Sequence, residues 1–94
     1  MNKYEAVIIL RANAAEEETV AFGEKMKELI NANGELTNVE EWGKKTFAYE
    51  IKKQTEGFYT LFTFEAKPEF VAELDRVLRL DEIVLKHMIV KLED

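Results

Sequence analysis

The fold of this chain is decided by the stretch Phe58-Tyr59-Thr60-Leu61-Phe62-Thr63-Phe64-Glu65-Ala66-Lys67-Pro68. Its aromatic and β-branched residues predict a β-strand over Phe58–Ala66. Pro68 predicts the first turn of a helix, where its missing N–H is not needed. Alternate side chains of a strand point to opposite faces of a sheet. One face therefore carries Phe58, Thr60, Phe62 and Phe64, and the other carries Tyr59, Leu61, Thr63 and Glu65.

Two segments have the apolar period of a helix, one after Pro68 and one over Glu16–Asn33. The second of these begins with three glutamates, which offset the positive end of a helix dipole. Gly34 predicts a left-handed residue that closes this helix, although Asn33-Gly34 is also a hairpin-turn pair. One helical stripe of the earlier helix carries Phe22, Met26, Leu29, Ile30 and Asn33, and the expected buried stripe of the later helix carries Phe70, Val71, Leu74, Val77 and Leu78.

Three further extended segments are Lys3–Leu10, Leu36–Ile51 and Val84–Leu92. Gly43 interrupts the second and predicts a bulge or bend, and the polar segment Lys52–Gly57 predicts a turn that ends at its glycine. The order β-α-β-β-α-β, with one apolar face on each helix, places both helices on the same side of one sheet. We therefore expect one α+β domain over residues 1–94, with a ferredoxin-like fold and a four-stranded antiparallel sheet of order 4-1-3-2.

This arrangement leaves the second face of the sheet uncovered. An exposed apolar patch on a small domain usually marks a partner site, so we expect this face to bind a protein. Trp42 either packs under the bulge at Gly43 or anchors a partner. The residues expected at the protein contact are Val7, Ile9, Trp42, Tyr59 and Leu61, with Met88 or Val90 beside them.

Composition argues against chemistry. The chain has no cysteine, no serine and a single histidine, His87, so we expect no thiolate or zinc site, no serine nucleophile, no cofactor, no small-molecule substrate and no catalytic residue. The start lacks the apolar core of a signal peptide, and the longest apolar run, residues 6–10, is too short to cross a bilayer. The expectation is a soluble cytoplasmic protein with no membrane partner.

The charge is unevenly distributed. The net charge is −6, with −5 in residues 1–43 and −1 in residues 44–94. Lysine pairs precede and follow the strand segment 46–51, at Lys44-Lys45 and Lys52-Lys53. Lysines neutralise phosphates without reading sequence, and nearby aromatic rings stack bases or pack against a protein. The competing interpretation is an edge strand that lysine protects against aggregation.

Several segments, in order, resemble the bacterial small-subunit ribosomal protein six family. They are Tyr4-Glu5, Gly34, the stretch from Gly43 through Ala48-Tyr49 to Gly57 and Tyr59, Leu78-Arg79-Leu80, and Met88-Ile89-Val90-Lys91. The resemblance implies a structural, non-catalytic protein that binds the central domain of 16S ribosomal RNA together with small-subunit ribosomal protein eighteen. By position it implies RNA contacts at Lys3, Lys44, Lys45, Arg79 and Lys86, to which clustering adds Lys52 and Lys53. The alternative is a protein-interaction or regulatory ligand-binding module that self-associates through its open sheet.

Overall fold

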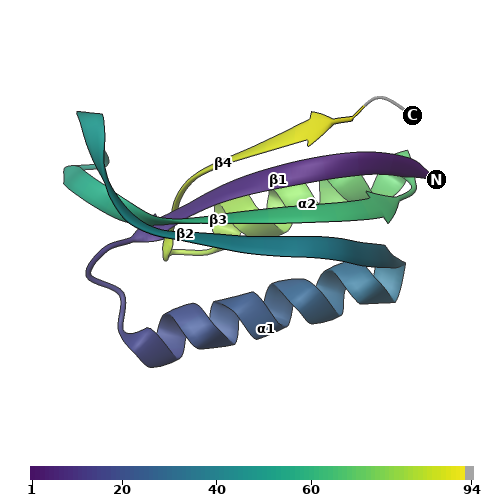
Figure 1. Ribbon diagram of the computed structural model, residues 1–94, viewed down its shortest axis with the longest axis horizontal. Coiled ribbons are helices and arrows are strands. Elements are labelled where there is room, and N and C mark those ends of the chain that lie inside the picture. The colour runs from purple at the N-terminus through teal and green to yellow at the C-terminus, as the bar shows by residue number, and fades with distance from the viewer. Residues whose placement is uncertain (93–94) are drawn as a thin grey trace.

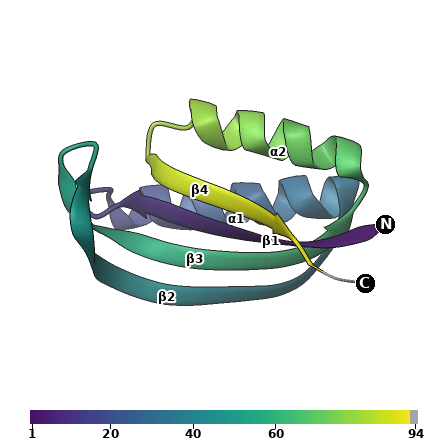
Figure 2. The same ribbon diagram turned by 90° about the horizontal axis from the view of Figure 1, so that it is seen from above.

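The computed structural model describes residues 1–92, which form four strands and two helices. The antiparallel sheet has the order β2-β3-β1-β4, and both helices lie on one side of it (Figures 1 and 2). Read from the other edge, this is the expected order 4-1-3-2, so the predicted ferredoxin-like fold is confirmed. The elements are β1 (Asn2–Arg11), α1 (Glu16–Asn33), β2 (Gly34–Ile51), β3 (Gln54–Ala66), α2 (Pro68–Leu80) and β4 (Val84–Lys91).

The core lies between the helices and the sheet face that they cover. Phe62 and Phe64 of β3 are buried there, as the alternation of that strand predicts. Each fully buried apolar side chain of this size contributes about 1.5–3 kcal/mol. The other buried members of this cluster are Tyr4, Ala6, Ile8, Leu10, Phe22, Met26, Ile30, Ala66, Phe70, Leu74, Leu78 and Val84.

The passage from α1 into β2 differs from the prediction. Gly34 is extended, with φ −178° and ψ −142°, so it begins β2 and does not close the helix in a left-handed conformation. A Cβ at this position would collide with the carbonyl oxygen of Glu65. Glycine is therefore needed for close approach to β3. The helix end is satisfied locally, because the side chain of Asn33 donates to the carbonyl of Leu29 over 2.9 Å.

The β2–β3 hairpin also differs from the prediction. Its turn consists of Lys52 and Lys53 alone, with φ values of 49° and 66°, and Ile51 pairs with Gln54 across it. Positive φ at both central residues is the geometry of a type I′ turn. The expected turn over Lys52–Gly57 is therefore wrong, because β3 already begins at Gln54.

Gly57 is a buried residue within β3. A Cβ there would lie 2.7 Å from the carbonyl oxygen of Leu10 and 2.9 Å from Cζ of Phe47. The missing side chain lets Phe47 lie against β3. Figures 1 and 2 both show this end of the hairpin bending away from the line of its strands.

The predicted bulge at Gly43 is confirmed. The β2–β3 register shifts between Glu41 and Gly43, and Gly43 has a φ of +80°. Trp42 is the extra residue of this bulge.

Among the described residues, neither helix is long and apolar enough to cross a membrane.

Candidate nucleic-acid and protein interface

The sheet face opposite the helices is organised in rows across the strands. One row runs from Gly43 through Tyr59 and Ile9 to Lys86, and the next contains Leu61, Val7 and Met88. This pairing brings together four of the five residues predicted to contact a protein. The fifth, Trp42, lies beside Gly43 in the bulge.

The predicted patch is less exposed than expected. Ile9 and Leu61 are each only 7% exposed, while Val7 and Tyr59 are half-buried. A Cβ built at Gly57 would press on the side chains of both Ile9 and Phe47. The curled hairpin therefore lies close to Ile9 and covers part of the face. The expectation that Ile9 and Leu61 form an exposed surface is wrong. The large apolar side chains that are exposed on this face and along the curled hairpin are Trp42, Tyr49, Met88 and Val90.

The bent end of the hairpin and the sheet enclose a shallow groove of about 410 Å³. Its apolar lining includes Val7, Ile9, Phe47, Tyr59 and Met88, and Lys86 stands at one side. The groove therefore combines an apolar floor with an exposed cation.

Trp42 forms an aromatic cluster on the open face. Its ring stacks on Tyr59 with centroids 6.4 Å apart and an interplanar angle of 21°, and Phe47 lies 6.1 Å from Tyr59 on a tilted plane. Lys45 Nζ lies 5.9 Å from the centroid of the Trp42 ring, within cation–π distance. Trp42 Nε1 donates to Glu40 over 3.2 Å. The two roles expected for Trp42 were packing under the bulge and anchoring a partner. Because the residue is 43% exposed beside the bulge, its ring is available to a partner.

Lys44 and Lys45 point to opposite faces of β2. Lys44 Nζ lies 5.6 Å from the centroid of Phe58, whose side chain faces the helices, whereas Lys45 lies over Trp42 on the open face. Period-two alternation requires this division. The sequence pair therefore does not act as one contiguous positive patch.

The other predicted basic residues are all exposed but do not form one cluster. Lys52 and Lys53 form the tip of the hairpin, and Lys86 lies on the open face in the Tyr59 row. Lys3 lies opposite Glu65 in the β1–β3 register, at the end of the sheet far from the hairpin. The structure thus groups Lys45, Lys52, Lys53 and Lys86 toward one end of the molecule and separates Lys3 from them.

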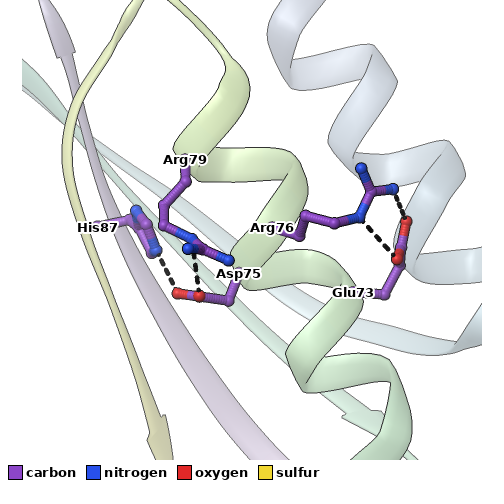
Figure 3. A network of polar contacts seen from close by, with 5 residues as sticks. All are labelled: Glu73, Asp75, Arg76, Arg79 and His87. Atoms are coloured by element: carbon purple, nitrogen blue, oxygen red, sulfur yellow. Dashed lines mark hydrogen bonds and ion pairs between the residues drawn. The ribbon is translucent and has the colours of Figure 1, made fainter.

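Arg79 belongs to a polar network between α2 and β4 (Figure 3). One carboxylate oxygen of Asp75 accepts a hydrogen bond from His87 Nε2 over 2.6 Å. The other oxygen forms an ion pair with Arg79 Nε over 3.2 Å. The hydrogen bond from His87 is the main cause that holds the pKa of Asp75 below its ordinary value, and the charges of His87 and Arg79 act in the same direction. Part of the positive charge of Arg79 is therefore already matched within the protein.

Three features of this region were not predicted from the sequence. Leu85 is buried at the irregularity between β1 and β4, Glu40 accepts from Trp42, and Asp75 bonds His87. The half-buried histidine on β4 was the available signal for the Asp75 contact. Across the described residues, no group of three or more His, Asp or Glu side chains is placed to hold a metal ion.

The fold and this surface define a ferredoxin-like domain whose open sheet face carries exposed aromatic and basic side chains. The model of the family described as ribosomal protein S6 matches residues 3–91. The small ribosomal subunit protein bS6 of Alkaliphilus oremlandii is 46% identical over 93 residues, covering 99% of each chain, and that of Clostridium kluyveri is 50% identical over 92 residues, covering 97% of each. The crystal structure of 30S ribosomal protein S6 from Thermotoga maritima aligns with a TM-score of 0.92 and 31% identity, covering 97% of this chain and 87% of that one.

This chain belongs to the ribosomal protein S6 family. It is a structural component of the small ribosomal subunit and not an enzyme. Family membership favours the first of the two functions expected from the sequence.

Proposed function

We propose that this chain binds the central domain of 16S ribosomal RNA together with small-subunit ribosomal protein eighteen, in the cytoplasmic ribosome. The observation that carries the proposal is the gathering of Lys45, Lys52, Lys53 and Lys86 around the hairpin end of the open face. Each lysine neutralises a phosphate and releases a counterion. The exposed ring of Trp42 lies within this group, where it contacts RNA or the protein partner.

Binding as a pair is supported by the overall charge. At a net charge of −6, the isolated chain is repelled by RNA except over its basic end. A protein partner that covers part of the acidic surface would remove this penalty. We therefore expect weak RNA binding by the chain alone and strong binding by the pair.

The protein contact is proposed at Val7, Trp42 and Tyr59, with Met88 exposed beside them and with Ile9 and Leu61 underneath. These residues share the open face, and the aromatic cluster supplies a rigid apolar surface. Aromatic side chains are the usual anchors of protein interfaces.

The test is to measure affinity for the central-domain RNA with and without protein eighteen over a series of salt concentrations. Replacing both Lys52 and Lys53 by alanine should reduce the salt slope of the pair by up to about two phosphate contacts. The single variants Lys44→Ala and Lys45→Ala separate the two faces of β2, and Lys67→Ala, at the start of α2, is the charge-matched control. Equal RNA affinity with and without protein eighteen would contradict paired binding, and an unchanged slope would remove the lysines from the RNA contact.

A further inference from the structure

A second groove lies on the other side of β2, between that strand and α1. Figure 1 shows α1 meeting β2 at the C-terminal end of the helix and separating from it toward the helix N-terminus. The space between them has a volume of about 250 Å³. Its floor is apolar and contains the buried residues Leu10, Phe22 and Phe62. Val20 stands at its side, 58% exposed.

Gly23 lines this groove from the middle of α1. Glycine is a poor residue for a helix interior and is normally kept there because another group packs closely against it. No atom of the described residues, apart from its own chain neighbours and the backbone of its own helix, would come within 4 Å of a Cβ built at Gly23. The fold therefore gives no internal reason for glycine at this point, and the open space beside it faces the groove.

The surface around the groove is strongly acidic. Residues 16–41, which run from the start of α1 to the bulge of β2, contain eight glutamates and two lysines, a net charge of −6. The rest of the chain is balanced, with eleven groups of each sign. Glu24 and Glu41 lie at the groove itself, together with one lysine, Lys27, whose Nζ lies 4.0 Å from Glu24, so acidic charge prevails there. This charge repels RNA and selects a cationic occupant.

The groove also reaches the proposed protein contact. Gly43 and Tyr59 line it at one end, and on the opposite face of the sheet Tyr59 stacks against Trp42. The sign of the charge changes at the same place, since Glu40 and Glu41 precede Gly43 and Lys44 and Lys45 follow it. A protein lying in the groove would therefore meet RNA bound beyond the bulge.

We infer that the groove between α1 and β2 binds a cationic segment of the protein partner, which inserts an apolar side chain beside Gly23. The inference rests on the proposed pairing with protein eighteen and adds to it a second contact surface around the edge of β2. The acidic surface attracts the segment, and the apolar floor holds the inserted side chain.

The test is the affinity of purified protein eighteen for variants of the intact chain, measured by calorimetry without RNA. Gly23→Leu fills the groove with a good helix former. It should therefore melt no lower than the wild type and bind protein eighteen at least tenfold more weakly. The matched control Gly23→Ala gains the same helical preference without filling the groove, and it should bind like the wild type.

The acidic surface is tested separately by replacing Glu24 and Glu41 with glutamine. This variant should lose up to about fivefold in affinity for each carboxylate and should depend less on salt. Glu69→Gln, on α2 and outside the groove, is the control for removal of a single carboxylate and should leave both unchanged.

The outcomes distinguish the two proposals. If the wild type pairs with protein eighteen but Gly23→Leu binds equally well, the groove is not the contact and the pairing stands. If Glu24 and Glu41 can be neutralised with no change in affinity or salt dependence, the cationic nature of the occupant is wrong. If the wild type does not bind protein eighteen at all, the proposed pairing fails and the inference fails with it.

Discussion

His87 on β4 lies 2.6 Å from Asp75 on α2, measured from Nε2 to Oδ1. An ionised carboxylate only accepts hydrogen bonds, so the imidazole donates. The contact joins the edge strand of the sheet to the helix that covers it (Figure 3). The bond also fixes where Asp75 holds Arg79, because its other oxygen accepts from that guanidinium.

The first prediction concerns pH. The pKa of Asp75 is lowered in the folded protein, chiefly by the hydrogen bond from His87. A carboxyl group with a lowered folded pKa contributes stability above its unfolded pKa, and this contribution is lost as the pH falls through the folded pKa. Asp75→Asn should therefore reduce the free energy of unfolding at pH 7, and the difference from the wild type should shrink below about pH 4.

Urea unfolding of the two proteins between pH 7 and pH 3 provides the measurement. Glu82→Gln, in the turn that follows the same helix, is the control for loss of a carboxylate. A difference between wild type and Asp75→Asn that stays constant over the whole range would show that the Asp75 contact does not contribute.

The second prediction concerns the hairpin turn. Lys52 and Lys53 both have positive φ, which costs a residue with a side chain roughly 1–2 kcal/mol relative to glycine. Replacing the pair with Asn-Gly, the preferred sequence of a type I′ turn, should raise the free energy of unfolding by about 1–2 kcal/mol. If the lysines contact RNA, the same variant should weaken RNA binding by the pair with protein eighteen. Denaturant unfolding and RNA titration test both effects, and a variant that is stabilised without losing RNA affinity would remove the lysines from the RNA contact.

The third prediction compares two glycines. Gly57→Ala should destabilise the protein by about 1–3 kcal/mol, because its Cβ would press on the backbone of Leu10 and the ring of Phe47. Gly23→Ala should stabilise it by about 0.5–1 kcal/mol, because the new Cβ meets open space in a helix. Thermal or urea unfolding measures both. Stabilisation by Gly57→Ala would contradict the close approach of the hairpin to β1.

The fourth prediction concerns Trp42. Its ring is half exposed, so Trp42→Ala should cost only about 0.5–1.5 kcal/mol, the value of an aromatic pair. It is the only tryptophan of the chain, so its fluorescence reports this site alone. Protection from acrylamide quenching on addition of protein eighteen, without RNA, is the expected result. Protection that appears only with RNA would assign the ring to the nucleic acid.

The extent to which sequence predicted the structure varies with the range of the interaction. The stripes of α1 and α2 and the two faces of β3 were predictable, because each depends on a local period. The turn at Lys52-Lys53 was not, because lysine is unusual at positive φ and Gly57 offered a more conventional turn residue. The prediction that Gly34 closes the helix was wrong because its role depends on a distant contact: the residue allows close approach to Glu65, about thirty residues away.

By itself, the sequence determined the order of elements, the face of each element that is buried and the family to which the chain belongs. These follow from residue type and spacing along the chain. Only the tertiary structure decided which face of the sheet each of Lys44 and Lys45 lies on, that Ile9 and Leu61 are covered, and that His87 meets Asp75. It also decided that the strand predicted over Phe58–Ala66 begins four residues earlier, at Gln54, and curls together with β2 at the hairpin. The physical reason is that the bulge at Gly43 sets the directions of the side chains that follow it in β2, while the bend of the hairpin and the packing of α2 on β4 depend on contacts between segments distant in sequence.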